Sequence, residues 1–165
     1  MTAPELHRPF DVSRIGRAGA DIEVKATAAE CTRLAVRLGL PALYELVCRF
    51  HLSAMPGGIV LAAGHLQARP VQVCVISLEE FEAVVDERFT ARFVPEHEIG
   101  DEIDPETDDE IPYTGSTIDL GEATAEQLAL SLDQFPRAPG AELPATDPDK
   151  TDHPFGKLAQ FKPRK

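Results

Sequence analysis

Hydrophobic and polar residues alternate through the middle of the chain with the period of two that is typical of β-strands. Residues 44–52 place four apolar side chains on one face: Leu46, Cys48, Phe50 and Leu52. Pro56-Gly57-Gly58 then predicts a turn, after which residues 59–69 return as an antiparallel partner. This part of the chain is therefore predicted to be a β-hairpin.

The alternation continues beyond the hairpin, with one interruption. Pro70 has no N–H to donate, which predicts a bend or an edge position there. Residues 71–76 form the next predicted strand, with Cys74 in its middle, and 77–80 form a turn. Residues 81–94 then return, with Phe89, Ala91 and Phe93 facing inward. Together these segments predict an antiparallel meander.

Helical spacing appears twice, in segments that flank this meander. Thr27 and Glu30 fit a capping box, and the apolar residues after them recur at helical spacing until Gly39. A second helix is predicted over 121–132, from an apolar stripe that includes Thr124. Near the N-terminus, 10–15 is predicted to be a first strand or an extended arm, and 22–26 a second strand.

These elements predict an α+β fold: an antiparallel, curled or barrel-like sheet of about five to seven strands, with two helices packed against it. Residues 96–110 contain nine acidic and no basic residues, so we expect a mobile acidic loop over 95–117. We predict one domain over 1–137, followed over 138–165 by a Pro-rich linker and a short tail.

Charge is distributed unevenly along the 165 residues, whose net charge is −12. Residues 1–94 carry 10 Lys and Arg against 11 acids, whereas 95–146 carry one against 14. A direct nucleic-acid binder usually presents a basic face, so a basic protein partner is electrostatically easier for this chain to attract than bare RNA.

Candidate chemistry is sparse, and we predict no catalytic residue, metal site or cofactor. Cys74 has no nearby histidine that would make it a nucleophile, so we interpret it as a small buried apolar residue. His51 and His65 are predicted to lie on neighbouring strands, where exposed polar faces explain them better than a metal site. Three widely spaced cysteines, without an apolar leader or a membrane-length apolar run, indicate the cytoplasm.

Several sequence blocks follow one another in a recognisable order: Arg8-Pro-Phe-Asp-Val-Ser-Arg14-Ile15, Leu34-Ala-Val-Arg-Leu38, Gln72-Val-Cys74-Val-Ile-Ser-Leu78-Glu79, Phe89-Thr-Ala-Arg-Phe93, Ile118-Asp119-Leu120-Gly121-Glu122, Glu126-Gln127-Leu128-Ala129-Leu130 and Pro154-Phe155-Gly-Lys-Leu158. This ordered set resembles the YceD family of large ribosomal RNA subunit accumulation proteins. Many members carry a C-x-x-C pair near the position of Cys74, which this chain lacks. The resemblance implies a non-enzymatic role in ribosome biogenesis, without a cofactor.

We therefore expect the chain to bind a large-subunit precursor or a basic ribosomal protein, whether or not it contacts RNA directly. The candidate partner-binding residues are an N-terminal arginine group and part of the acidic run: Arg8, Arg14, Arg17, Arg33, Arg37, Glu102, Asp104, Asp108, Asp109 and Glu110. The alternatives are a small-molecule-binding protein or enzyme with a pocket inside the curled sheet, and an acidic decoy for a nucleic-acid-binding protein.

Overall fold

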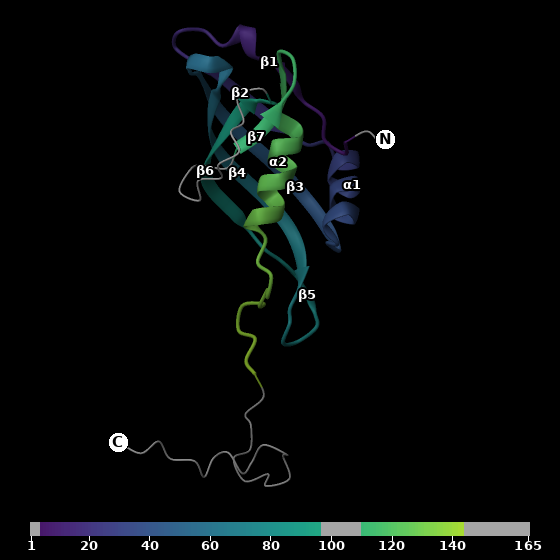
Figure 1. Ribbon diagram of the computed structural model, residues 1–165. Coiled ribbons are helices and arrows are strands. Elements are labelled where there is room, and N and C mark those ends of the chain that lie inside the picture. The colour runs from purple at the N-terminus through teal and green to yellow at the C-terminus, as the bar shows by residue number, and fades with distance from the viewer. Residues whose placement is uncertain (1–3, 97–109, 144–165) are drawn as a thin grey trace, which may run out of the picture.

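The computed structural model describes residues 4–96 and 110–143. Its main sheet has the order β2-β3-β4-β6-β7, and β5 pairs with the far end of β4. These strands are β2 (Ala20–Lys25), β3 (Ala42–Ala54), β4 (Val60–Val73), β5 (Glu80–Glu82), β6 (Val85–Pro95) and β7 (Glu110–Tyr113). All pairings are antiparallel except that of β6 with β7 (Figure 1). The α+β prediction is confirmed, and the sheet stays open instead of closing into a barrel.

Two short strands hold the N-terminal segment beside the second helix. β1 (Pro9–Asp11) pairs antiparallel with β8 (Thr117–Asp119) in a separate two-stranded sheet. The predicted first strand is therefore shorter than 10–15, because a 3-10 turn over Val12–Arg14 follows β1 directly. β7 lies within the predicted loop over 95–117, and β8 begins at the last residue of that loop, so the loop prediction was wrong for 110–113. Residues 97–109 lie outside the described residues.

Both helices form where they were predicted. α1 (Ala28–Leu38) begins at the capping box: the Glu30 amide donates to Thr27 Oγ at 3.3 Å, and the Thr27 amide donates to Glu30 Oε2 at 2.7 Å. It ends at Gly39, whose φ of 66° is a left-handed conformation that glycine adopts at no steric cost. α2 (Leu120–Ser131) begins one residue earlier than predicted, with Asp119 as its N-cap.

The hairpin of β3 and β4 is confirmed, joined by a turn over Pro56–Gly58. Pro70 does not interrupt β4 but marks the point where the neighbour of β4 changes. Residues 60–68 pair with β6 and 71–73 with β5, while the Pro70 carbonyl accepts a hydrogen bond from the Ala83 amide at 2.8 Å. The single strand predicted over 81–94 is consequently divided into β5 and β6.

The core lies between the helices and one face of the sheet, and it is filled by apolar side chains. Phe50, Leu66 and Phe93 are each exposed by 2 % or less. The Phe89 ring stands at 88° to that of Phe50 and lies over Gly64, where a Cβ would come within 2.3 Å of it. Because these side chains fill the interior, they occupy the space that a small-molecule pocket inside a curled sheet would require.

Candidate functional site

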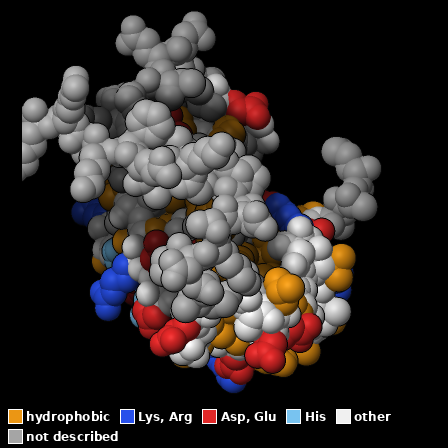
Figure 2. Space-filling model, turned by 90° about the horizontal axis from the view of Figure 1, so that it is seen from below, with side chains coloured by type: hydrophobic (Ala, Val, Ile, Leu, Met, Phe, Trp, Pro, Cys, Tyr) orange, Lys and Arg blue, Asp and Glu red, His pale blue; other side chains and the backbone are white. Residues whose placement is uncertain are grey.

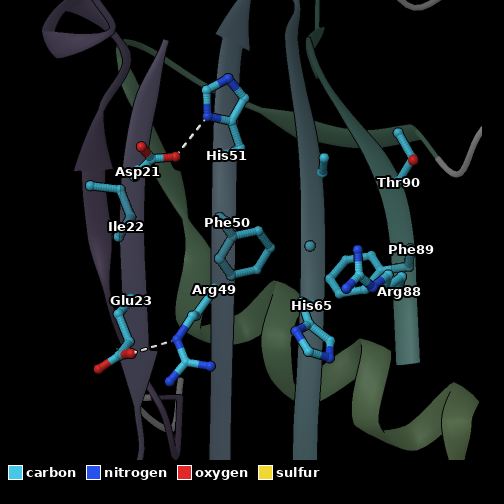
Figure 3. A pocket seen from close by; sticks show the side chains of 12 residues that line it. Asp21, Ile22, Glu23, Arg49, Phe50, His51, His65, Arg88, Phe89 and Thr90 are labelled. Atoms are coloured by element: carbon cyan, nitrogen blue, oxygen red, sulfur yellow. Dashed lines mark hydrogen bonds and ion pairs between the residues drawn. The ribbon is translucent and has the colours of Figure 1, made fainter. Parts of the chain in front are cut away.

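The sheet face opposite the core is not covered by either helix, and it carries the charged residues of the strands. We call this the open face; in Figure 3 it faces the viewer, with α2 behind the strands. The cross-strand register places its side chains in rows. On β2, β3, β4 and β6 the open face consists of Asp21, Glu23, Lys25, Val47, Arg49, His51, Ser53, Leu61, Ala63, His65, Gln67, Asp86, Arg88, Thr90 and Arg92.

One row brings three basic side chains together on adjacent strands. Arg49 on β3 lies opposite His65 on β4, and His65 lies opposite Arg88 on β6. The neighbouring row contains His51, Ala63 and Thr90, so small side chains adjoin the basic ones. A hollow of roughly 760 Å³ is lined by these two rows, by β2 and by the row of Phe50, Gly64 and Phe89 between them (Figure 3). Pockets of this size are typical of binding sites in proteins.

Acidic and amide side chains hold three of the four basic residues around the hollow. Arg49 Nε donates to Glu23 at 2.9 Å and Arg49 Nη1 to Gln67 at 3.2 Å. His51 Nδ1 lies 2.7 Å from Asp21, and His65 Nε2 lies 2.7 Å from Asp86. Within the part of the chain that the structure describes, Arg88 forms no ion pair. It is therefore the basic side chain that is most available to a ligand.

The two histidines lie on neighbouring strands, as predicted, yet each contacts a different aspartate. The hydrogen bond from His65, followed by that from Gln67, lowers the pKa of Asp86 below its usual range. Among residues 4–96 and 110–143, no group of three or more His, Cys, Asp or Glu side chains is arranged to hold a metal ion. This arrangement favours carboxylate–imidazole pairing over metal binding.

Several of the predicted N-terminal arginines stabilise the fold through ion pairs. Arg8 makes a bidentate pair with Glu30, at 2.9 Å from each guanidinium nitrogen, and also donates to the Lys25 carbonyl. The hydrogen bond from Arg8 is the largest reason why the pKa of Glu30 falls to about 2. Because α1 carries Glu30, this pair ties the N-terminal segment to the helix.

Arg37 and Arg33 extend the same network toward α2. Arg37 donates to both carboxylate oxygens of Glu122 and to Glu5 at 3.0 Å, while Arg33 donates to the Glu5 carbonyl at 3.1 Å. Arg8, Arg33 and Arg37 are therefore brought together around glutamates, which neutralise most of the charge that an RNA phosphate would meet.

The remaining predicted residues are not part of that network. The Arg14 guanidinium lies 5.7 Å from the centre of the Phe10 ring, and exposed Arg17 lies in the loop before β2. On β7, Glu110 pairs with Arg92 at 3.1 Å. Glu102, Asp104, Asp108 and Asp109 lie outside the described residues. The ten predicted residues are thus distributed over at least three parts of the chain.

Cys74 begins the turn between β4 and β5, so its predicted position in the middle of a strand was wrong. Its predicted burial is confirmed, since its exposure is 0 %. The end of the molecule that carries β5 exposes apolar and acidic side chains next to one another (Figure 2). Exposed Val73, Val75 and Leu78 belong to this end of the molecule.

The turn geometry makes Cys74 the most acidic of the three thiols. Hydrogen bonds from Ser77, and further ones from the Ala138 and Ile76 amides, lower the pKa of Cys74 to about 7 because they stabilise the thiolate. Burial raises the pKa of Cys48 to about 12 and also raises that of Cys31.

We therefore predict that Cys74 ionises near neutral pH while the other two thiols remain protonated. Thiolate absorbance at 240 nm, measured from about pH 6 to 9 around the usual thiol pKa, should rise with one titrating group. That rise should vanish in Cys74→Ser and persist in Cys31→Ser. A titration unaffected by Cys74→Ser would contradict the assignment.

Sequence reasoning identified His51 and His65 as neighbours but missed the hollow and the contribution of Arg49 and Arg88. The sequence did carry a signal for the open face, because polar residues occupy alternate positions on three successive strands. Its recognition required the register, because only the register places Arg49, His65 and Arg88 in one row.

The fold and the open face define a small α+β protein with one helix-covered and one polar sheet face. Neither described helix has the length and apolarity that a membrane crossing requires. The family model described as "Large ribosomal RNA subunit accumulation protein YceD" matches residues 62–162, more than half of the chain. The chain therefore belongs to the YceD family, as its sequence blocks predicted. No curated protein and no solved structure matches it in the two other comparisons.

Proposed function

We propose that this protein supports the accumulation of large-subunit ribosomal RNA in the cytoplasm by binding, without catalysis, to a precursor of the large ribosomal subunit. The observation that carries the proposal is the match to the YceD family over residues 62–162. A family named for ribosomal RNA accumulation implies a role in ribosome biogenesis, and binding is the simplest way in which a small protein protects or organises a precursor.

Two parts of the chain are suited to different components of such a precursor. The acidic run, which includes Glu102, Asp104, Asp108, Asp109 and Glu110, is electrostatically complementary to a basic ribosomal protein. Ten of the 16 Lys and Arg residues lie in the nearly neutral portion over 1–94, where an RNA phosphate meets less repulsion. We infer that the precursor contacts both parts.

The N-terminal arginines are less available to bind RNA than we predicted from their positions in the sequence. Arg8 and Arg37 each form ion pairs with partly buried carboxylates, and an RNA phosphate would have to compete with these partners. Arg14 and Arg17 make no ion pair among the described residues, so they remain the N-terminal candidates for contact with a precursor.

The proposal predicts that the tagged full chain captures large-subunit precursor RNA from a lysate of its own cells. Large-subunit precursor RNA should be enriched over small-subunit RNA, relative to an unrelated protein of equal net charge. Nuclease treatment before capture should release any protein that is held through RNA, and should leave a directly bound basic ribosomal protein in place. If neither large-subunit RNA nor a ribosomal protein is enriched over the acidic control, the proposed function is wrong.

A further inference from the structure

We propose that Arg49, His65 and Arg88, around the hollow of the open face, bind the phosphodiester backbone of RNA. The identity of the phosphate carrier rests on the proposed function, whereas the site itself rests on the arrangement of the sheet. The site is distinct from the N-terminal arginines, and it adds an RNA-contacting surface to a chain whose net charge is −12.

The first observation is that three basic side chains occupy adjacent positions of one row. Arg49, His65 and Arg88 are direct cross-strand neighbours, and the row ends on β2 at Glu23, which lies opposite Arg49. The chain has 28 acidic and 16 basic residues, yet no acid stands between the three bases. Adjacent basic side chains on one sheet face attract an anionic ligand.

The second observation concerns the availability of the two guanidinium groups. Arg88 is exposed and makes no ion pair with any described residue, so its charge is free for a ligand. The Arg49 side chain is 57 % exposed, and its partner Glu23 is 52 % exposed, so a phosphate can replace that surface carboxylate at little cost. The planar guanidinium donates two parallel hydrogen bonds to phosphate as well as to carboxylate.

The third observation is the shape of the surface beside the row. Ala63 and Thr90 have small side chains, so the hollow is open next to the three bases. Its volume of roughly 760 Å³ exceeds that of one phosphate and accommodates a short stretch of backbone. Figure 3 shows His65 and Arg88 on adjacent strands at one side of the hollow and His51 at another.

The chemistry of the face indicates contact with the backbone more than with the bases. On β2, β3, β4 and β6, the open-face positions carry no Phe, Tyr or Trp, and the His51 and His65 rings are held by Asp21 and Asp86. Phe50 and Phe89 line the bottom of the hollow but pack against the core. Guanidinium and hydroxyl groups instead favour phosphate oxygens, which position RNA without reading its sequence. Asp21, Glu23 and Asp86 also border the site and limit its affinity, because they repel phosphate and compete for the bases.

The test uses the purified full chain and a fluorescein-labelled single-stranded oligouridylate, with binding followed by fluorescence anisotropy. Arg88→Ala and Arg49→Ala should each weaken binding about tenfold, because each removes a charge-assisted contact. Each should also reduce the slope of log Kd against log salt by about one, as expected for one lost phosphate contact. Because both side chains are exposed, thermal unfolding should stay close to that of the natural protein.

Arg69→Ala is the matched control, since Arg69 is an exposed arginine on β4 whose ion pair is with Glu82 at 2.6 Å. Its affinity for the oligonucleotide should change less than about twofold, which is the spread expected for a surface residue outside the site. Equal weakening by all three variants, or no effect of Arg49→Ala and Arg88→Ala, would overturn the proposed site. Inorganic phosphate or uridine monophosphate that displaced the oligonucleotide at equal concentration would assign the hollow to a small phosphate ligand instead of RNA.

This experiment separates the site from the proposed function. If the natural protein captures precursor RNA from lysate while oligonucleotide binding is insensitive to Arg49→Ala and Arg88→Ala, the function stands and the open-face site is wrong. If the variants lose oligonucleotide binding but the natural protein captures no precursor, the site stands as a phosphate site and the proposed function is wrong.

Discussion

Gly121→Ala is expected to lower the free energy of unfolding by about 2 kcal/mol. A Cβ at this position would lie 2.5 Å from the Leu6 carbonyl oxygen and 2.9 Å from the Arg8 amide nitrogen. Both are backbone atoms of the N-terminal segment, so neither can move aside as a flexible side chain would. α2 and that segment must therefore separate, which disturbs the packing of the fully buried Leu6 side chain.

The sign of this effect is decided by two opposing contributions. Alanine is intrinsically better than glycine in a helix by about 1 kcal/mol, which favours the variant. Overpacking against backbone costs about 1–3 kcal/mol, and here it also strains the hydrogen bond from the Arg8 amide to Asp119 Oδ1, 2.9 Å long. We expect the clash to dominate.

Urea unfolding followed by circular dichroism measures the change. Gly16→Ala is the control, because its Cβ would have no neighbour closer than 3.9 Å and its φ is not in the left-handed region. Its stability should change by less than about 0.5 kcal/mol. An unfolding midpoint for Gly121→Ala at or above that of the natural protein would show that the close approach of α2 to the N-terminal segment is not present.

Asp119→Ala is expected to cost about 2 kcal/mol, because one carboxylate joins three parts of the structure. Asp119 Oδ1 accepts hydrogen bonds from the Gly121 amide at 2.9 Å and the Glu122 amide at 3.2 Å, which caps α2. It also accepts from the Arg8 amide at 2.9 Å, and His7 contacts Oδ2. Alanine leaves these amide groups without their partner.

The same residue predicts a pH dependence. Partial burial raises the pKa of Asp119, but the hydrogen bonds from Arg8, His7 and the Glu122 amide outweigh it, so the pKa lies below its usual value. A carboxyl group with a lowered folded-state pKa stabilises the protein above its unfolded-state pKa of about 4, and this stabilisation is lost as the pH falls below that value. The stability difference between the natural protein and Asp119→Ala should therefore shrink below about pH 4.

Unfolding free energies at about pH 6 and about pH 3, on either side of that pKa, test both parts of this prediction. Asp11→Ala is the matched control, since Asp11 caps a 3-10 turn through the Ser13 amide but joins no other segment. It should lose less stability than Asp119→Ala. A difference for Asp119→Ala that is equal at both pH values would contradict the role of the ionised carboxylate.

The sequence predicted those parts of the fold that depend on local signals. The capping box of Thr27 and Glu30 and the turn at Pro56-Gly57-Gly58 located α1 and the central hairpin, because their patterns need few distant contacts. Alternation likewise placed Phe50 and Phe93 in the core. These elements agree with their local propensities.

Long-range pairing accounts for the elements that the sequence did not predict. β1 pairs with β8 more than 100 residues away, and β7 is a four-residue parallel strand that contains Pro112. Neither has a local signal strong enough to distinguish it from loop. The sequence did not show that β4 continues through Pro70. The residue lies where the neighbour of β4 changes from β6 to β5, and this change is visible only in the assembled sheet.

The candidate site shows the same difference between features set by local sequence and features set by long-range pairing. The arginines near the N-terminus were predicted to bind a partner because several lie close together in the sequence. In the structure, Arg8 and Arg37 instead form ion pairs with glutamates of α1 and α2. The row of Arg49, His65 and Arg88 is dispersed over 40 positions of sequence and converges only through strand register. A cluster of charged side chains that forms across a sheet therefore cannot be recognised from the spacing of charged residues along the sequence.

The most direct test of the account is capture of precursor RNA by the natural protein and by an Arg49→Ala/Arg88→Ala double variant from lysates of the same cells. We predict that the natural protein enriches large-subunit precursor RNA over small-subunit RNA. The double variant, folded and present at equal amount, should lose most of that enrichment, while Arg69→Ala keeps it. Equal enrichment by the natural protein and the double variant would contradict the open face as the RNA-binding surface, and no enrichment by the natural protein would contradict binding of the precursor itself.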